Sequence, residues 1–381
     1  MEYLLDGIKG LYNEPGRIVM MIIGCVLIVL AIKKGLEPAL LLPMGFGAIL
    51  VNIPLSGAID QLIAGTVEQH GIIQWLFEIG IEASEALPLL LFIGIGAMMD
   101  FGPILSNPKL MLFGAAAQVG IFVTIVFARL LGFDLADAAS IGIIGAADGP
   151  TSILVSQVLK SSYTGAIAVA AYSYMALVPI IQPIVMKVCT TKKERQIRME
   201  YKPASVSKTT RIIFPIAVTV IAGLVAPASV SLVGFLMFGN LLRECGVLDS
   251  LKDEASNHLS NLITLLLGIT ISFSMKAEEF LSFNTLLIMG LGLAAFVFDT
   301  FGGIMFAKFL NLFSKKKINP LIGAAGISAF PMASRVVQKV GLEADPTNHL
   351  LMHAAGANVA GQIASVVAGG VLLSLVPGLL G

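Results

Sequence analysis

Long apolar runs, many of them close to the ~20 residues that a helix needs to cross a bilayer, recur along the whole chain. Short polar segments separate them. They predict membrane-crossing helices near residues 17–33, 36–54, 86–100, 110–131 and 163–188, and again near 211–227, 229–243, 258–273, 284–312 and 346–377. Residues 60–82, which include Glu68, Glu78 and Glu82, predict an interfacial amphipathic segment instead.

Two further apolar segments are interrupted by helix-breaking residues. The first, residues 138–160, contains Asp-Gly-Pro-Thr, and the second, residues 320–340, has a proline on either side of its break. The tetrapeptide Ile-Gly-Ala-Ala occurs in both, at 144–147 and at 322–325, an offset of 322 − 144 = 178 residues. Because Gly-Pro interrupts a helix and frees backbone carbonyls, each segment predicts a broken, re-entrant element.

The basic residues orient these elements. The densest basic segment lies at 187–211 and the next at 315–317, and the positive-inside rule places both in the cytoplasm. Each half then has five crossings and one re-entrant element, so the second half is inserted upside down relative to the first. We therefore predict an all-α polytopic membrane protein with two inverted-topology repeats, at 1–190 and 211–381, joined by a basic cytoplasmic linker at 191–210.

Composition supports a membrane protein and excludes several other classes. The chain has 381 residues, of which 56% are hydrophobic and 13% charged, whereas soluble domains carry about 25% charged residues. The formal net charge is zero, which makes nucleic acid an unsuitable partner. Three cysteines without metal-like spacing and four histidines argue against a zinc, haem or iron–sulfur site.

Asp148 is the strongest candidate for chemistry. It lies in an apolar segment directly before Gly149 and Pro150, and a carboxylate at membrane depth usually faces a cavity, a partner or an ion path. Sodium prefers oxygen ligands, and the Asp148 carboxylate, the Thr151 and Ser152 hydroxyls and the freed carbonyls would supply them. The alternative is an acid in an interfacial turn.

The second broken element offers neutral oxygen ligands and one cation. Asn319 and Ser328 could bind sodium, although Asn319 could equally cap the helix that starts at Pro320. Gly323 permits close approach of the backbone. Arg335 lies among small and apolar residues, where it could bind a carboxylate with its planar guanidinium or simply extend to the membrane surface.

Two other helices carry polar groups at membrane depth. Tyr172 and Tyr174 lie within the long apolar run that follows the first break, where a tyrosine hydroxyl could donate a proton or bind a ligand. His353 and Asn358 lie on the last, Gly/Ala-rich run. We interpret His353 as a structural polar residue, and Asn358 as either structural or part of the site.

These motifs resemble those of one known family. Gly-Ala-Ala-Asp148-Gly-Pro-Thr, Tyr172-Ser-Tyr174-Met, Asn319-Pro-Leu-Ile-Gly323 and His353-Ala-Ala-Gly-Ala-Asn358 are similar to motifs of the β subunit of the biotin-dependent sodium-pumping decarboxylases, which act on oxaloacetate, methylmalonyl-CoA or glutaconyl-CoA. The resemblance covers essentially the whole chain. The family often has Gly-Gly-Ala-Asp and Ala-Ala-Arg where this chain has Gly-Ala-Ala-Asp and Ala-Ser-Arg, which are small-for-small changes.

The resemblance implies a reaction and its partners. A carboxyltransferase α subunit would load CO₂ onto biotin on a biotin carrier protein, and this chain would release CO₂ from that carboxybiotin and export Na⁺. A small single-span γ/δ-type subunit, an oligomeric complex and a bacterial or archaeal cytoplasmic membrane are implied as well. The short region before the first crossing favours a member that acts on a CoA ester.

The resemblance also implies residue roles. Asp148, Asn319 and Ser328 would be linked to sodium, with Thr151 as a further ligand and Gly323 lining the same path. Arg335 would hold the carboxylate of carboxybiotin, and Tyr174 would pass a proton to the ureido nitrogen. Asn358 is a further candidate for cofactor binding.

Two alternatives remain at this point. A stand-alone sodium-coupled secondary transporter, such as a carboxylate symporter or a sodium/proton antiporter, would have the same broken helices and buried acid but no carrier subunit. A purely structural membrane subunit would need neither the broken helices nor the buried acid. Co-purification with a biotinylated protein would distinguish the first alternative from the decarboxylase subunit.

Overall fold

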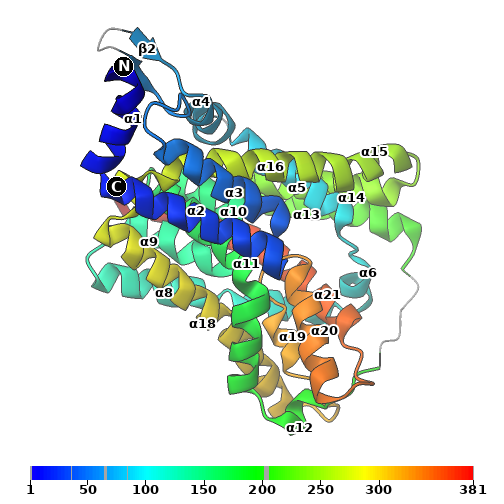
Figure 1. Ribbon diagram of the computed structural model, residues 1–381. Helices are drawn as coiled ribbons and strands as arrows, with labels where there is room; N and C mark the ends of the chain where they lie inside the picture. The colour runs from blue at the N-terminus through cyan, green and yellow to red at the C-terminus, as the bar shows by residue number, and fades with distance from the viewer. Residues whose placement is uncertain (1, 36, 64–66, 84, 201–205, 381) are drawn as a thin grey trace.

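The computed structural model describes residues 2–35, 37–63, 67–83, 85–200 and 206–380 (Figure 1). In these residues the chain is helical apart from one antiparallel pair of short strands, β1 (Gln61–Ile63) and β2 (Val67–Gln69), which confirms the predicted helical class. The segment predicted to be interfacial and amphipathic contains these strands. It continues as α4 (Ile72–Phe77) and a π-helical turn, η1 (Glu78–Glu82), so it is not one uniform amphipathic helix.

Six helical segments among the described residues are long and apolar enough to cross a membrane. They are Pro15–Lys34, Pro108–Leu130, Thr164–Cys189, Asp249–Met275, Phe283–Phe313 and Leu351–Leu379. A seventh is α4 with η1 followed by α5 (Ala86–Met98), which are bent by 65°. The predicted crossings at α3 (Pro38–Asn52), α13 (Lys208–Val225) and α14 (Val230–Cys245) are not among them, and these helices have only 15, 18 and 16 residues. Crossing by these three stays a prediction.

The remaining elements complete the helical arrangement. Those of the first half are α1 (Glu2–Asn13), α2 (Pro15–Lys34), α6 (Gly102–Ser106), η2 (Pro108–Leu110), α7 (Met111–Ala117), α8 (Val119–Leu130), α9 (Leu135–Gly142), η3 (Ile143–Ala146), α10 (Gly149–Val158), α11 (Thr164–Cys189) and α12 (Lys192–Arg195). Those of the second half are η4 (Pro227–Ser229), α15 (Asp249–Asp253), η5 (Glu254–Leu259), α16 (Ser260–Ile271), η6 (Ser272–Met275), α17 (Ala277–Phe280), α18 (Phe283–Phe313), α19 (Leu321–Ala324), α20 (Met332–Ala344) and α21 (Leu351–Leu380).

The first broken segment folds as a hairpin, which we call the first hairpin: α9 and η3 lead into the break and α10 leads back. Asp134 caps α9 by accepting a hydrogen bond from Asp137 N at 2.7 Å. Asp137 Oδ1 accepts from Ser161 Oγ at 2.6 Å and from Ser162 N at 3.1 Å. The two ends of this hairpin therefore lie together.

The second broken segment is also a hairpin, called here the second hairpin, and consists of α19 and α20. Its ends are joined to the linker between the halves, since Asp345 pairs with Arg198 at 2.7 Å and Asn319 Nδ2 donates to Arg195 O at 2.9 Å. The 26 residues of α11 separate this end from Ser161 and Ser162, about 39 Å at 1.5 Å per residue. The two hairpins thus open at opposite ends of α11.

The breaks of the two hairpins meet in the interior. Ser328 N donates to Ala146 O at 3.0 Å, which joins the second break to the first. The second hairpin also approaches α18 closely, because a Cβ on Gly323 would lie only 2.0 Å from Gly303 O. Both breaks are buried, so the sequence segments that looked most irregular form the centre of the molecule.

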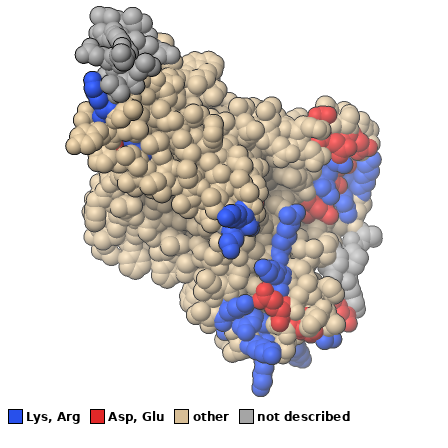
Figure 2. Space-filling view, viewed as in Figure 1, with Lys and Arg blue, Asp and Glu red and all other residues tan. Residues whose placement is uncertain are grey.

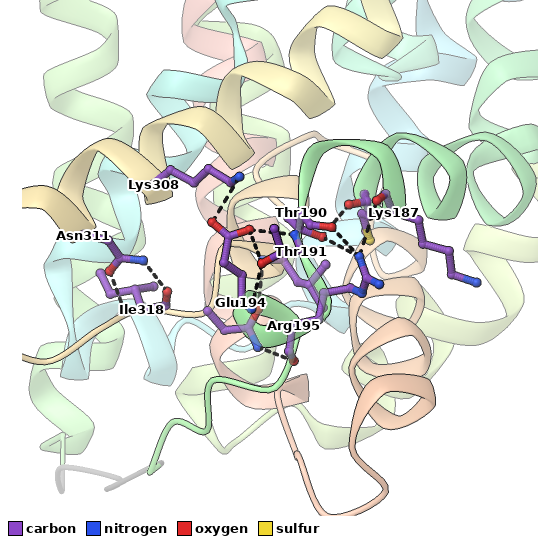
Figure 3. A network of polar contacts seen from close by, with 11 residues as sticks. Lys187, Thr190, Thr191, Glu194, Arg195, Lys308, Asn311 and Ile318 are labelled. Carbon is purple, nitrogen blue, oxygen red and sulfur yellow. Dashed lines mark hydrogen bonds and ion pairs between the residues drawn. The ribbon is translucent and has the colours of Figure 1, made fainter.

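Charged side chains gather toward one end of the molecule, which we call the basic end. In Figure 2 most of the lysine, arginine and acidic side chains lie over the lower and right-hand parts of this face, with a few basic side chains near the middle and at the upper left. Figure 3 shows part of the basic end, where Glu194 caps α12 and pairs with Lys308 of α18 at 3.1 Å. Asn311 Nδ2 donates to Ile318 O at 2.7 Å in the same region. The Glu194–Lys308 pair thus fastens the linker to α18, and the Asn311 contact fastens the segment after α18 to its end.

Candidate functional site

Asp148 is the N-cap of α10, at the point where the first hairpin turns back. Its φ and ψ of −124° and 94° are extended, and Oδ1 accepts from Thr151 N at 3.3 Å. Pro150 stands in the first turn of α10, where its missing N–H is no loss. Ala147, just before Asp148, has a left-handed φ of 53°, so the chain reverses sharply here.

The other carboxylate oxygen of Asp148 is held by the last helix, α21. Gln362 Nε2 and Ser365 Oγ donate to Asp148 Oδ2 at 2.9 and 2.7 Å. Sequence reasoning missed both residues. A signal was present, because Asn358, Gln362 and Ser365 recur at intervals of four and three residues and so form a polar stripe on one face of a Gly/Ala-rich helix.

A cavity of about 200 Å³ adjoins Asp148 and is lined by both hairpins. Ser328 and Gln362 line it, as does Tyr172 of α11, whose buried hydroxyl has no hydrogen-bond partner among the described residues. The Thr151 hydroxyl lies beside the Asp148 carboxylate, but its geometry is outside that of a hydrogen bond. No basic side chain neutralises Asp148 within the described part of the chain.

The structure brings Ser328 to the cavity at Asp148, and it places Asn358 against the second break next to Ser328. Ser328 Oγ donates to Gly361 O of α21 at 3.2 Å, and Asn358 Nδ2 donates to Ile327 O at 2.7 Å. The amide oxygen of Asn358 is buried and has no partner among the described residues. Both side chains therefore connect α21 to the second break, and both retain acceptor oxygens.

Asn319, Gly323 and Tyr174 are placed elsewhere, and the arrangement lends no support to direct ligand roles for them. Asn319 Oδ1 accepts from Leu321 N at 3.0 Å beside the first turn of α19, whose N-cap residue is Pro320, and this contact is close to the capping role that the sequence left open. Gly323 packs against Gly303. The Tyr174 hydroxyl donates to the carbonyl of Met289 in α18, and Tyr174 does not line the cavity.

Arg335 lies on α20 with an exposed side chain, and no hydrogen bond or ion pair of its side chain is found among the described residues. Its charge acts on Glu37, which lines the cavity beside Asp148 at the start of α3. Burial raises the pKa of Glu37, and the positive charge of Arg335 opposes that rise. Arg335 thus lies within electrostatic reach of an acid that lines the cavity, although Arg335 itself is not among the lining residues.

A larger cavity of about 700 Å³ lies away from Asp148, at the basic end. Arg198, Lys316, Lys317 and His353 are among the residues that line it. His353 lines this cavity and not the one at Asp148, and its interpretation as a structural polar residue stays a prediction.

The arrangement can hold a small, hard cation. One carboxylate without a basic partner lies among neutral oxygens, at a break where irregular backbone lines a cavity. Such a meeting of discontinuous helices is how many membrane transporters build ion sites. The fold and the site thus define a polytopic membrane protein with a buried site suited to a cation.

Comparison with known proteins defines the family. The family model for the "Na+-transporting oxaloacetate decarboxylase beta subunit" matches residues 16–376. The chain is 51% identical to the methylmalonyl-CoA decarboxylase subunit beta of Propionigenium modestum, with 98% of both chains covered. It is 49% identical to the glutaconyl-CoA decarboxylase subunit beta of Acidaminococcus fermentans, covering 95% of this chain and 94% of that one.

An oxaloacetate-specific relative is more distant. The oxaloacetate decarboxylase beta chain of Klebsiella pneumoniae is 43% identical, with 99% of each chain covered. The chain therefore belongs to the family of beta subunits of Na⁺-transporting decarboxylases, and it is a multi-pass membrane subunit of such an enzyme.

Proposed function

We propose that this chain decarboxylates carboxybiotin supplied by a biotin carrier protein and couples CO₂ release and proton consumption to Na⁺ export. The observation that carries the proposal is the position of Asp148, buried where the two hairpins meet and held only by neutral donors. Membership of a Na⁺-transporting family supplies the identity of the cation. A stand-alone transporter receives no comparable support.

The orientation follows from the basic end. Positive charge collects on the cytoplasmic side of membrane proteins, so the linker and the opening of the second hairpin face the cytoplasm of a bacterial or archaeal cell. The two ends of the first hairpin then face the outside of the cell. This supports two inverted repeats, at 1–190 and 211–381, with the linker at 191–210 between them.

Carboxybiotin would enter from the cytoplasmic side. There the planar guanidinium of Arg335 can bind its carboxylate with two N–H donors. The N–CO₂⁻ bond breaks, CO₂ leaves, and the ureido nitrogen takes up one proton. A hydroxyl in the cavity is suited to deliver that proton, and Tyr172 has its hydroxyl free there while Tyr174 is bonded to Met289. Loss of the substrate carboxylate removes one negative charge from the neighbourhood of Asp148.

That change of charge would couple the reaction to transport. A nearby anion raises the affinity of a site for Na⁺, and its removal lowers it. We assign Na⁺ to Asp148 and Thr151, with Ser328 and the amide oxygen of Asn358 as further ligands on the second hairpin side. Export of one charge against ~100 mV requires about 2.3 kcal/mol, so release must be tied to decarboxylation.

The chain would work inside a larger complex. A biotin carrier protein, a carboxyltransferase α subunit and a small single-span γ/δ-type subunit are its expected partners, in an oligomeric assembly. The relatives named for CoA-ester decarboxylases are more similar to this chain than the oxaloacetate relative, with identities of 51% and 49% against 43%. We therefore propose that the complex acts on an acyl-CoA.

The test uses the purified protein in liposomes with carboxybiotin and ²²Na⁺. Wild-type protein should decarboxylate carboxybiotin only with Na⁺ present and should move Na⁺. Asp148→Asn should abolish both activities. Asp134→Asn is the matched control, because Asn can still cap α9 while the same charge is removed elsewhere in the first hairpin. Retained Na⁺-dependent decarboxylation in Asp148→Asn would contradict the proposal.

A further inference from the structure

Asp299 is a second carboxylate in the interior, and the proposed reaction makes no use of it. It lies in the middle of α18 and has no exposed surface. Its Oδ1 accepts from Gly120 N at 2.6 Å, and the N–H of Ile121 is directed at the same carboxylate. α8 begins at Val119, after a break within the Pro108–Leu130 span, and Ile121 N also donates to Gln118 O at 3.2 Å, so Gly120 N is the main donor to this oxygen.

The second oxygen of Asp299 has no such partner. Oδ2 is buried and makes no hydrogen bond to any described residue, and no basic side chain acts on this carboxylate. A carboxylate at this depth that lacks a counter-charge is strongly disfavoured. The N–H of Gly120 donates one hydrogen bond to Oδ1, which leaves the anion only partly compensated.

Two glycines create the space for this carboxylate. A Cβ on Gly120 would lie 2.5 Å from Oδ1, and a Cβ on Gly145 would lie 2.7 Å from Oδ2. Gly145 belongs to η3 of the first hairpin, three residues before Asp148. The unpartnered oxygen of Asp299 is therefore in direct reach of the segment that positions Asp148.

We propose that Asp299 binds a monovalent cation, H⁺ or Na⁺, on Oδ2, and that occupancy of this second site is coupled to Asp148 through η3. With the cation bound, a neutral group faces the backbone at Gly145. Without it, an anion with an unpaired oxygen faces the same backbone, which favours a shift of the first hairpin. The cation site itself does not depend on the proposed decarboxylation.

Infrared absorption spectra of the purified full-length chain, recorded first without Na⁺ and again after Na⁺ is added, test the cation site directly. If H⁺ is the ligand, the wild type shows the band of a protonated carboxyl that Asp299→Asn lacks. If Na⁺ is the ligand, the carboxylate bands shift on Na⁺ addition in the wild type and not in Asp299→Asn. Asp137→Asn, at the far end of the first hairpin, should leave either signal intact. Spectra in which Asp299→Asn alters neither signal would overturn the proposal.

Asp299→Asn retains an oxygen that can accept from Gly120 N, so we expect it to fold. Gly145→Ala provides a second approach, because its methyl group would occupy the space beside Oδ2 and should suppress the Asp299 signal. Coupling is measured separately: Asp299→Asn should change the Na⁺ concentration for half-maximal decarboxylation by roughly 5- to 150-fold, the range typical of coupled sites. An unchanged half-saturating concentration would refute the coupling even if the cation is bound. Because the infrared signal needs no turnover, its loss is distinguishable from failure of the decarboxylase proposal.

Discussion

Asn319 and Asn348, which stand at the two ends of the second hairpin, donate to the same two main-chain carbonyls. Asn319 Nδ2 lies 2.9 Å from Arg195 O and 2.8 Å from Ile197 O, and Asn348 Nδ2 lies 3.0 and 3.2 Å from the same atoms. The linker thus holds the two ends of the second hairpin together, while Ser328 at the break of this hairpin contacts Ala146. Asn319 can influence the buried site through this closure without touching an ion.

We predict that Asn319→Ala and Asn348→Ala each destabilise the protein, because each removes a donor to two partly buried carbonyls, at a cost of about 0.5–1.5 kcal/mol per hydrogen bond. Their effects should be non-additive, with a coupling of roughly 0.5–3 kcal/mol, since the two amides share their acceptors. Thermal unfolding of the two single variants and the double variant in detergent measures this coupling.

Asn284→Ala is a suitable control, because the one hydrogen bond of its amide among the described residues is to the Tyr163 hydroxyl, at the opposite end of the molecule. It should neither destabilise the second hairpin nor couple to Asn348. An Asn319→Ala variant with unchanged stability but a greatly weakened Na⁺ response would instead assign Asn319 to the ion, as the sequence motif first suggested.

The donors on α21 should tune the affinity of Asp148 for Na⁺. Gln362→Ala or Ser365→Ala frees Asp148 Oδ2 from one of its two hydrogen bonds and leaves the carboxylate less well oriented. Loss of such a supporting contact typically costs about 10- to 100-fold in metal affinity. The measurement is the Na⁺ concentration that gives half-maximal decarboxylation.

Ser374→Ala is the matched control for this prediction. Ser374 lies on the same helix and its hydroxyl donates only to Gly370 O, so its removal should leave Na⁺ affinity unchanged. Equal effects of Ser365→Ala and Ser374→Ala would show that α21 acts only as a packing element.

Much of this architecture was predictable, because helix breakers are local signals. Asp148-Gly-Pro and the prolines around the second break predict a broken helix in each half. The repeated Ile-Gly-Ala-Ala indicates that the two broken segments are equivalent parts of two repeats. Six or seven of the crossings satisfy the requirements of length and hydropathy. The bent connection of η1 to α5 was missed, because the Ala86–Met98 run alone is short and the preceding turn is rich in glutamate.

The details of the site depended on contacts that a sequence does not show. Tyr172 and Tyr174 are two residues apart and so project from nearly opposite sides of α11, and the pattern alone could not tell which side faces the cavity. The amide of Asn319 is used by main-chain carbonyls of the linker, which leave no sequence signature. Asp299 was overlooked because an isolated acid in a long apolar helix has no neighbouring break in its own sequence.

The tyrosine pair gives a third prediction. Tyr172→Phe removes a free hydroxyl from the cavity and should slow decarboxylation by roughly 10²-fold or more, the usual contribution of a positioned proton donor. Tyr174→Phe removes a bond to Met289 O and should lower the melting temperature more than the turnover rate. Single-turnover decarboxylation and thermal melting of both variants separate the two roles. The reverse result would assign proton delivery to Tyr174.

The last prediction concerns Arg335 and Glu37, the cavity-lining acid on which the charge of Arg335 acts. Arg335→Lys keeps the charge but loses the planar pair of donors, so the KM for carboxybiotin should rise roughly ten-fold, as expected for loss of one charged hydrogen bond. Arg129→Lys makes the same change near Phe133, whose carbonyl accepts from Arg129, and should have no effect.

Glu37 should make the affinity for carboxybiotin depend on pH. Burial raises the pKa of Glu37, so the carboxyl becomes neutral at a higher pH than usual for a glutamate. Below that pKa it no longer competes with the substrate carboxylate for Arg335, and KM should be low; above it the anion competes and KM should rise. Glu37→Gln should fix KM at the low-pH value over the whole range, as measured by initial rates in Na⁺-saturated proteoliposomes. A KM that rises with pH to the same extent in Glu37→Gln would show that another group controls access to Arg335.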